Sequence, residues 1–226
     1  GYDGFGAYDF ADTGYIEVSS FPDLQTDFTI SAWIKTRDRS ENGQRIFADD
    51  ETNTGGYALS LGDGAIGELR FFSRNMDTIS LDTTGANIQN DQWHHVVAVA
   101  DITNQRRQIW VDGVLRGEIT SDTGTWGTDA GAASVGGETN LGETTNRFDG
   151  YLDDVILWNK SLSPEQIQLL YQNRTDQIAS VDTSIDELWQ ACVTPNDGYA
   201  DGTELCSNSL RVRGLLELIA PANETI

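Results

Sequence analysis

The fold class is decided by one stretch of the sequence, Phe28-Thr-Ile-Ser-Ala-Trp-Ile34, in which apolar residues alternate with small or polar ones. Alternation with a period of two is typical of a strand with one face in a core, because successive side chains point to opposite faces. The segments Gly14-Tyr-Ile-Glu-Val18 and Tyr151 to Trp158 carry strand patterns on either side of it. We therefore predict a protein built from β-strands.

Further strand signals follow along the chain, separated by clusters of turn residues. The turn Asp112-Gly113 predicts a type I′ hairpin, because this pair readily adopts the positive φ angles that such a turn needs. Short strands at this spacing, roughly ten to fourteen of them, are typical of an antiparallel sandwich and not of a parallel α/β sheet. The remaining strand candidates are Gln44 to Phe47, Tyr57 to Leu61, Glu68 to Phe72, Thr78 to Leu81, Trp93 to Ala100, Gln108 to Val111, and Ser134 to Val135.

A single helix is predicted from Ser163 to Tyr171. Ser163 is suited to the N-cap, a proline follows at the first helical position, and Gln166 lies three residues after the cap. This is the pattern of a capping box, in which the two side chains satisfy each other's backbone donors. Ile167, Leu170 and Tyr171 share one face of the helix, which we expect to pack against the sandwich.

The composition changes near residue 175. Strand candidates in the remaining sequence are 177–181, 188–193 and 205–212, with turn signals between the last two. We therefore predict a small β appendage over residues 176–226, after a sandwich domain over residues 1–175.

Cys192 and Cys206 are the only cysteines of the sequence. Turn signals lie between them, so the chain turns back on itself and we predict a disulfide across a hairpin. Disulfides persist in oxidising compartments, and N-glycosylation sequons at Asn159, Asn173 and Asn223 agree with an extracellular or cell-surface location. No signal-peptide pattern opens the chain, so we expect it to come from a longer precursor.

The formal net charge of −22 limits the possible partners. An acidic surface repels phosphate backbones and anionic membranes, so we exclude nucleic acid as a ligand. The sequence also lacks an apolar run of about 18 residues, so we expect no membrane insertion. Carboxylates favour hard cations such as calcium, although a solvated, salt-adapted surface explains the same composition.

Taken in order, several phrases resemble the laminin G-like, concanavalin A-like family. They are Tyr15-Ile-Glu-Val18, Phe28-Thr-Ile-Ser-Ala-Trp-Ile34, Trp93-His-His-Val-Val97, Ile109-Trp-Val-Asp-Gly113, Phe148-Asp-Gly-Tyr-Leu-Asp-Asp-Val-Ile-Leu-Trp158 and the Leu162-Ser163 start of the helix. The resemblance implies an all-β fold: a two-sheet antiparallel jelly-roll sandwich with one concave sheet, followed here by one short helix and the small C-terminal β appendage. The segment Trp189-Gln-Ala-Cys-Val-Thr-Pro-Asn-Asp-Gly198 resembles linker or immunoglobulin-like modules of microbial surface proteins.

The resemblance also implies where calcium would bind. The expected site lies between the N-terminal strand and the last long strand, at positions that Asp9 and Asp153 match, with Asp154 and Asp12 nearby. Calcium takes about six to eight oxygen ligands from carboxylates, carbonyls and water. We therefore expect Asp9, Asp153 and Asp154 to contribute to a calcium site.

A second arrangement, similar to that of pentraxins, is also open. It would bring the acidic loop Ala48-Asp-Asp-Glu51 next to the loop Gly137-Glu-Thr-Asn140 at one edge of a sheet. For both arrangements, acidic loop residues that are simply solvated are the alternative explanation.

The carboxylate pattern of the related glycosidases is missing from the sequence. Laminarinase-type members of the superfamily place two glutamates on one strand, and a retaining glycosidase needs its carboxyl groups about 5 Å apart. No Glu-x-Asp-x-x-Glu run occurs, and the adjacent Asp153 and Asp154 of an ideal strand would face opposite ways. His94 and His95 are adjacent too, so they cannot readily share a metal and are predicted to be structural. We predict that the chain is not an enzyme.

Trp126 is the candidate for contact with a ligand. It lies in the polar, glycine-rich loop Thr123-Gly-Thr-Trp-Gly-Thr128, and an exposed ring there could stack on a sugar. A loop tryptophan folded back onto the sheet is the competing interpretation. Core or partly buried packing is expected for the tryptophans of the strand patterns, namely Trp33, Trp93, Trp110 and Trp158.

These observations favour a non-catalytic extracellular recognition module that binds a glycan or a cell-surface protein and is stabilised by calcium. A structural spacer in an adhesin-like surface protein is the competing class. An auxiliary domain of a carbohydrate-active enzyme is a third alternative. Function must be decided at the site, because one fold hosts many unrelated binding roles.

Overall fold

The computed structural model describes residues 1–11, 14–22, 24–37, 43–50, 55–126, 129, 131–138, 146–174 and 176–213. The chain divides into two compact units, which we call the sandwich unit (Gly1–Asn173) and the appendage unit (Arg174–Ile226). Composition places the boundary after residue 175, and the structure places it after Asn173.

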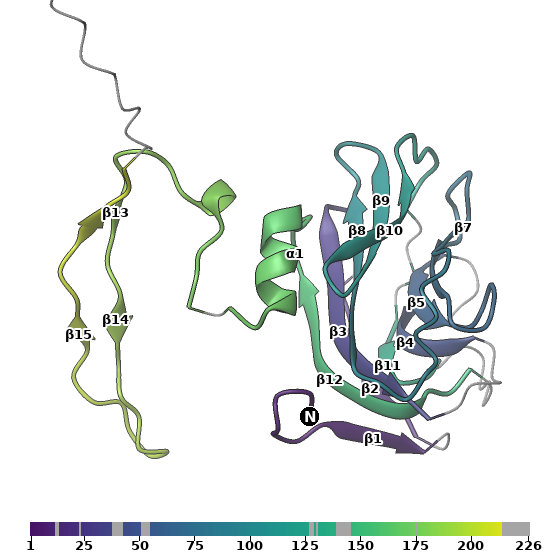
Figure 1. The fold of residues 1–226 in the computed structure, drawn as a ribbon, viewed down its shortest axis with the longest axis horizontal. Coiled ribbons are helices and arrows are strands. Elements are labelled where there is room, and N and C mark those ends of the chain that lie inside the picture. The colour runs from purple at the N-terminus through teal and green to yellow at the C-terminus, as the bar shows by residue number, and fades with distance from the viewer. Residues whose placement is uncertain are drawn as a thin grey trace, which may run out of the picture. The chain divides into compact units, whose positions relative to one another are not determined.

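The described residues of the sandwich unit form two six-stranded sheets (Figure 1). Sheet A has the order β1-β12-β3-β8-β9-β10, with β1 (Tyr8–Ala11), β12 (Asp149–Trp158), β3 (Phe28–Thr36), β8 (His94–Asp101), β9 (Arg106–Val111) and β10 (Val114–Ile119). Sheet B has the order β2-β11-β4-β5-β6-β7, with β2 (Ile16–Val18), β11 (Ala133–Val135), β4 (Gln44–Asp49), β5 (Tyr57–Leu61), β6 (Leu69–Ser73) and β7 (Ser80–Asp82). Neighbouring strands run antiparallel in both sheets, which confirms the predicted jelly-roll sandwich.

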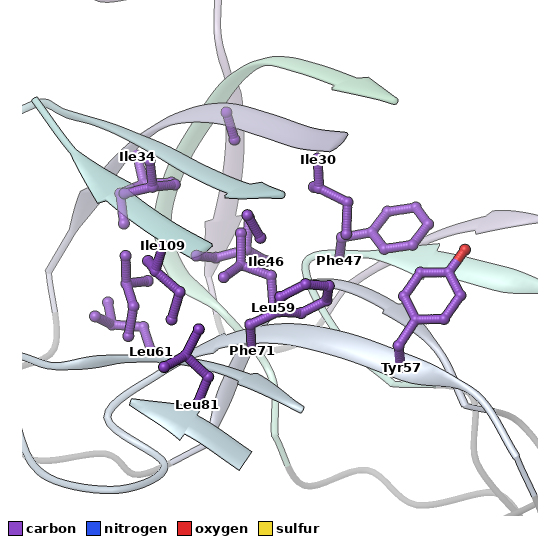
Figure 2. Packing of buried hydrophobic residues seen from close by; sticks show 14 of the residues in the cluster. Ile30, Ile34, Ile46, Phe47, Tyr57, Leu59, Leu61, Phe71, Leu81 and Ile109 are labelled. Atoms are coloured by element: carbon purple, nitrogen blue, oxygen red, sulfur yellow. The ribbon is translucent and has the colours of Figure 1, made fainter. Parts of the chain in front are cut away.

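One apolar core fills the space between the sheets, and Figure 2 shows its packing. Ile30 and Ile34 of sheet A pack with Leu59 and Phe71 of sheet B, and all four side chains are fully buried. Side chains alternate along each strand, so every second residue points into this core. Burial of an apolar side chain of this size contributes about 1.5–3 kcal/mol relative to exposure, so the core is the main source of stability.

Trp126 belongs to this core. Its side chain is only 8% exposed, and its ring makes T-shaped contacts with Phe28 at 5.4 Å and with Tyr57 at 6.1 Å between centroids. Its interpretation as an exposed ring for stacking on a sugar is therefore corrected: the loop tryptophan is folded back onto the sheets. The physical reason is the large apolar area of the indole, which is better buried among aromatic rings than left in water.

Helix α1 (Pro164–Tyr171) covers part of the outer face of sheet A. The Ser163 hydroxyl accepts from the backbone of Gln166 at 3.2 Å, and the Gln166 side chain accepts from the backbone of Ser163 at 2.8 Å, which confirms the capping box. Ile167 is fully buried and packs with Val99 of β8, so the predicted apolar face docks on the sandwich.

Two strands of sheet A and one segment of the appendage differ from the sequence prediction. The strand patterns did not include β1, which only the family resemblance implied, or β10; these are the two edges of sheet A, where a weak burial pattern leaves little alternation to detect. The strand predicted over residues 177–181 is wrong. That segment contains no strand, and a 3-10 helix spans Ser180–Asp182.

The appendage unit contains two ladders of two-residue strands. They pair β13 (Leu188–Trp189) with β16 (Leu210–Arg211), and β14 (Cys192–Val193) with β15 (Leu205–Cys206). Cys192 and Cys206 lie directly opposite each other and form a disulfide, which confirms the predicted pairing. Over both units, no helix within the described ranges has the length and apolarity needed to cross a bilayer.

Candidate functional site

A β-bulge in β12 is an irregular point of sheet A. Asp153 pairs with Trp33 of β3, but Ile156 pairs with Ser31, so two residues of β12 oppose one residue of β3. Asp154 lies in the bulge with a φ of 43°, in the left-handed region that non-glycine residues rarely adopt. Bulges re-aim side chains and occur often beside functional sites, so this position is a candidate site.

The bulge brings Asp153 and Asp154 to the same side of sheet A. The hydroxyl of Tyr2 donates to Asp154 Oδ2 at 3.2 Å, and the ring of Tyr2 stacks on Trp33 at 4.0 Å between centroids. Burial and the charge of Asp154 raise the pKa of Tyr2 to about 12. Asp153 Oδ2 lies against the adjacent residue Gly1, so the segment that holds Tyr2 lies beside both carboxylates. The expectation that they face opposite ways is wrong, because it holds only for a strand without a bulge.

The segment before β1 adds further oxygen atoms next to Asp153. A Cβ atom built on Gly1 would clash with Asp153 Oδ2, and it would lie 2.9 Å from the Gly6 carbonyl oxygen and 3.0 Å from Asp3 Oδ1. The amino group of Gly1 donates to the carbonyl of Phe5. Two carboxylates and two carbonyls therefore surround Gly1, and we call these four groups the oxygen set. Hard cations such as calcium take ligands of this kind.

Asp9 lies apart from the oxygen set. Strand β1 pairs with β12 as the resemblance implies, but Asp9 Oδ1 lies 2.7 Å from Nη2 of Arg37. Asp9, Asp153 and Asp154 do not form a group whose ligand atoms all lie within 4.8 Å of one another, all three being described residues. Asp9 therefore neutralises Arg37, and Asp12 falls outside the described residues.

The pentraxin-like arrangement is described only in part. Glu51 lies outside the described residues, as do the residues directly after Glu138. The Asp50 carboxylate pairs with Arg74, and Nε of Arg45 lies 3.0 Å from Glu138 Oε2. Guanidinium groups thus neutralise both of these carboxylates, so their charge is matched within sheet B.

Aromatic rings lie on the outer face of sheet A beside the oxygen set. Trp33, Trp93 and Tyr151 are half-buried, and we call them, with Tyr2 stacked on Trp33, the aromatic patch. Trp93 contacts Tyr2 edge-on at 6.5 Å and Tyr151 at 6.3 Å between centroids. The four rings therefore form one continuous surface.

Charged side chains border the aromatic patch. Lys35 Nζ lies 3.7 Å from Asp91, and the guanidinium of Arg37 lies 4.9 Å from the centre of the Tyr151 ring. Ligand sites in proteins commonly combine such apolar and aromatic surface with a few polar groups that fix orientation. The arrangement can accept a ligand with an apolar ring face and polar edges.

The two adjacent histidines have separate structural partners. His94 Nδ1 lies 2.8 Å from Asp112 Oδ2. His95 is buried beside Trp33 and Tyr171, and this burial lowers the pKa of His95 to about 4. His95 is therefore neutral near pH 7, in agreement with the structural role that the sequence predicts for both residues.

The arrangement of two antiparallel sheets and a capped helix defines a lectin-like jelly roll. Residues 10–168 match the sequence profile of the Concanavalin A-like lectin/glucanases superfamily, in its laminin G branch. The chain belongs to this family, which confirms the predicted resemblance.

Individual relatives are distant. A mouse protein named "Sushi, von Willebrand factor type A, EGF and pentraxin domain-containing protein 1" is 22% identical over 223 residues, a match that covers 93% of this chain and only 6% of that protein. The Ruminococcus gnavus IT-sialidase CBM40 bound to α2,3-sialyllactose superposes with a TM-score of 0.55 at 16% identity, covering 74% of this chain and 98% of that one. Domain 4 of an extracellular arabinanase from Geobacillus stearothermophilus, in complex with arabinotriose, superposes with a TM-score of 0.55 at 19% identity, covering 74% of this chain and 76% of that one. These two likenesses establish the fold.

Sequence reasoning missed the aromatic patch, although one signal was present. Phe28, Ile30 and Ile34 share the core phase of β3, so Trp33 is out of phase and must point outward. The contribution of Tyr2 had no such signal, because it depends on a contact between residues far apart in the sequence.

Proposed function

We propose that the chain is a non-catalytic recognition module of an extracellular or cell-surface protein, and that it binds a glycan through the aromatic patch. The observation that carries this proposal is the row of half-buried rings on the outer face of sheet A, bordered by Lys35, Asp91 and Arg37. Sugars present an apolar face and polar edges, and this surface offers a matching group for each. The ring of Tyr2 stacks on Trp33, which shows that a flat ring can pack on this face of the sheet.

Two further observations support the proposal. Two solved proteins of this fold carry a bound oligosaccharide, although their sequences are too distant to transfer a site. The disulfide between Cys192 and Cys206 is of the kind that persists in oxidising compartments, which supports the extracellular location.

A glycan array, run with calcium and with a chelator, tests the proposed function. We expect binding to a defined set of sugars, and we expect Trp93→Ala to weaken it by about tenfold, since stacking and apolar burial by a large ring contribute more than 1 kcal/mol. The matched control is Trp189→Ala, which removes a half-buried tryptophan from the appendage unit. Silence of the wild-type chain on the array would contradict glycan recognition and favour the spacer.

Calcium is proposed to bind at the oxygen set, held by Asp153, Asp3 and the carbonyls of Phe5 and Gly6. The donor types suit calcium, because all four groups are oxygens and two carry charge. The Phe5 carbonyl accepts from the amino group of Gly1, which would have to move aside for the ion. The ion would supply positive charge that holds the segment before β1 against β12. Asp154, which accepts a hydrogen bond from the Tyr2 hydroxyl, would lie near the ion but would not be one of its ligands.

Thermal unfolding with calcium and with excess chelator tests this site. An ion that binds only the folded chain raises the free energy of unfolding by about 2.7 kcal/mol when its concentration is about a hundredfold above Kd. We expect Asp153→Asn to abolish the shift. Asp9→Asn is the matched control, because Asp9 pairs with Arg37 and should leave the shift intact. Superimposable melts of the wild-type chain would exclude the calcium proposal.

The proposal also excludes catalysis of glycoside hydrolysis. An acid and a nucleophile or base must be held on opposite sides of one glycosidic bond, and the only adjacent carboxylates that the sequence offers on a long strand are Asp153 and Asp154. Asp154 is exposed and accepts a hydrogen bond from Tyr2. Incubation with laminarin, agarose, carrageenan and alginate should release no reducing ends. Release that Asp154→Asn abolishes would overturn the assignment.

A further inference from the structure

A cavity of about 570 Å³ opens between the two sheets beside β1 and β2, and we call it the edge cavity. Its apolar walls come from both sheets, with Phe10 and Leu152 from sheet A and Ile16 and Val135 from sheet B. Ligand pockets in proteins typically have volumes of about 300–1,000 Å³. The edge cavity therefore has room for at least one large apolar side chain.

The edge cavity lies between two strand edges that carry no further strand. Among the described residues, β1 pairs only with β12 and β2 pairs only with β11. The opposite side of the sandwich is closed, because β10 lies against β7 so tightly that a Cβ on Gly117 would come 2.9 Å from the carbonyl oxygen of Asp82. Unpaired edges are where an extended segment of another chain can add to a sheet.

The rim of the edge cavity is apolar and acidic. Tyr8 lines the cavity and is 68% exposed, and Val18 of β2 is 40% exposed. Asp153 and Asp154 line the same cavity, and neither carboxylate pairs with a lysine or arginine in the part of the chain that the structure describes. With a net charge of −22, the chain repels acidic partners, including a second copy of itself.

We propose that the edge cavity binds an extended, basic segment of a protein partner, with one large apolar side chain in the cavity and a lysine or arginine beside Asp154. The outer edges of β1 and β2, which carry no further strand among the described residues, are where the incoming backbone would pair. A glycan is a poorer occupant, since these walls are mostly hydrocarbon. This surface shares Asp153 and Gly6 with the oxygen set and borders the aromatic patch, and its proposed partner goes beyond glycan recognition.

Fluorescence anisotropy with a labelled peptide of alternating lysine and valine tests the proposal on the full chain. Two matched peptides replace lysine by glutamate or valine by serine. We expect the lysine–valine peptide to bind, and the valine-to-serine change to weaken binding by about tenfold or more, since burial of a valine is worth about 1.5 kcal/mol or more. Equal binding of all three peptides would overturn the proposal.

Two variants of the chain locate the binding site. A Cβ on Gly6 meets no atom within 4 Å, so Gly6→Leu should fill the edge cavity without a clash and weaken binding by about tenfold. Gly14→Leu is the matched control, since a Cβ there also meets open space and Gly14 lies outside the cavity wall. Asp154→Asn tolerates the left-handed φ and should weaken binding by about two- to fivefold.

The remaining outcomes separate this proposal from the alternatives. Binding of the lysine–valine peptide should persist in Trp93→Ala, so a failure of glycan recognition leaves it standing. An unchanged affinity in Gly6→Leu would place the peptide elsewhere and refute the assignment. Sedimentation measures self-association in parallel. A dimer that Gly6→Leu dissociates would make a second copy the occupant and equally overturn the proposal.

Discussion

The sandwich unit and the appendage unit are each stabilised internally, and by different interactions. In the sandwich unit, side chains of both sheets share one core, and even Arg107 is fully buried, with Asp122 as its ion-pair partner. In the appendage unit, Ala179 is the only buried side chain among the described residues, and the ladders are two residues long. The disulfide between Cys192 and Cys206 is the strongest tie there.

The two units should therefore tolerate different kinds of substitution. A core loses free energy wherever a side chain is removed, because neighbours relax only partly into the space that is left. In a cross-linked segment without a core, most side-chain substitutions change the stability little, whereas removal of the cross-link lowers it. Recognition is therefore best carried by the sandwich unit, where the core holds the aromatic patch in a fixed geometry.

The largest expected effect comes from removing a core side chain. Phe71→Ala should lower the free energy of unfolding by about 3–5 kcal/mol, because Phe71 is fully buried between the sheets. Leu205→Ala in the appendage unit is the matched control, since Leu205 is 73% exposed and should cost less than about 0.5 kcal/mol. Denaturant unfolding measures both. Equal costs would refute the contrast between the two units.

Removal of the disulfide should act on the appendage unit alone. Replacing both Cys192 and Cys206 by serine opens the loop between them, whose ends are separated by 14 positions in the sequence. The loop-entropy argument gives a loss of about 3 kcal/mol for a loop of about 15 residues. We expect amide hydrogen exchange to accelerate over residues 188–211 and the melting temperature of the sandwich unit to stay unchanged. A fall in that temperature would show that the two units are coupled.

The stability of the sandwich unit should fall in mild acid because of His95. Burial lowers the pKa of His95 to about 4, whereas an unfolded histidine titrates near 6.5. Between these two values the unfolded chain binds a proton that the folded chain does not, so stability falls as pH decreases, by at most about 3 kcal/mol. His95→Phe should remove this part of the slope in urea titrations at pH 4–7, and an unaltered slope would exclude His95 as its source.

The appendage unit offers the contrast for this pH dependence. The backbone N–H groups of Ala200 and Tyr199 hold the pKa of Asp197 below its usual value, but Asp197 is fully exposed. Its carboxylate is solvated in both states. Asp197→Asn should therefore leave the acid sensitivity of the sandwich unit unchanged.

The smallest effect concerns the ends of the helices. Ser163→Ala should cost about 1 kcal/mol, because it removes the hydroxyl that caps α1. The 3-10 helix of the appendage unit has Ala179 at its N-cap and no side-chain hydrogen bond there. Thr183→Ala at the end of that helix is the control, and we expect no measurable change. A Ser163→Ala protein as stable as the wild type would show that tertiary packing alone positions α1.

Much of the fold could be predicted because its determinants are local. The alternation in Phe28 to Ile34 requires only neighbouring residues, and the capping box at Ser163 spans three positions. The edge strands β1 and β10 could not be found in this way. Their side chains are mostly exposed, so burial imposes no pattern on their sequence.

The candidate site could be predicted only as a set of residue types. Asp153 and Asp154 were identified, but their common direction depends on the bulge, which appears only when β12 pairs with β3. The assignment of Asp9 to calcium did not anticipate Arg37, which directly follows β3 and whose guanidinium reaches Asp9 on β1. Trp126 lies in a polar loop, and its burial depends on contacts with Phe28 of β3 and Tyr57 of β5.

Sequence patterns are enough to predict the all-β class, the helix after the last long strand and the disulfide of the appendage. These features follow from period, capping and turn residues, which act between neighbours in the chain. Only the tertiary structure decided that Trp126 is buried, that Tyr2 lies on Trp33 and that Asp153 and Asp154 share one side of sheet A. The physical reason is range: such contacts join residues that are far apart in sequence, and they form only when the strands have paired and the core has closed.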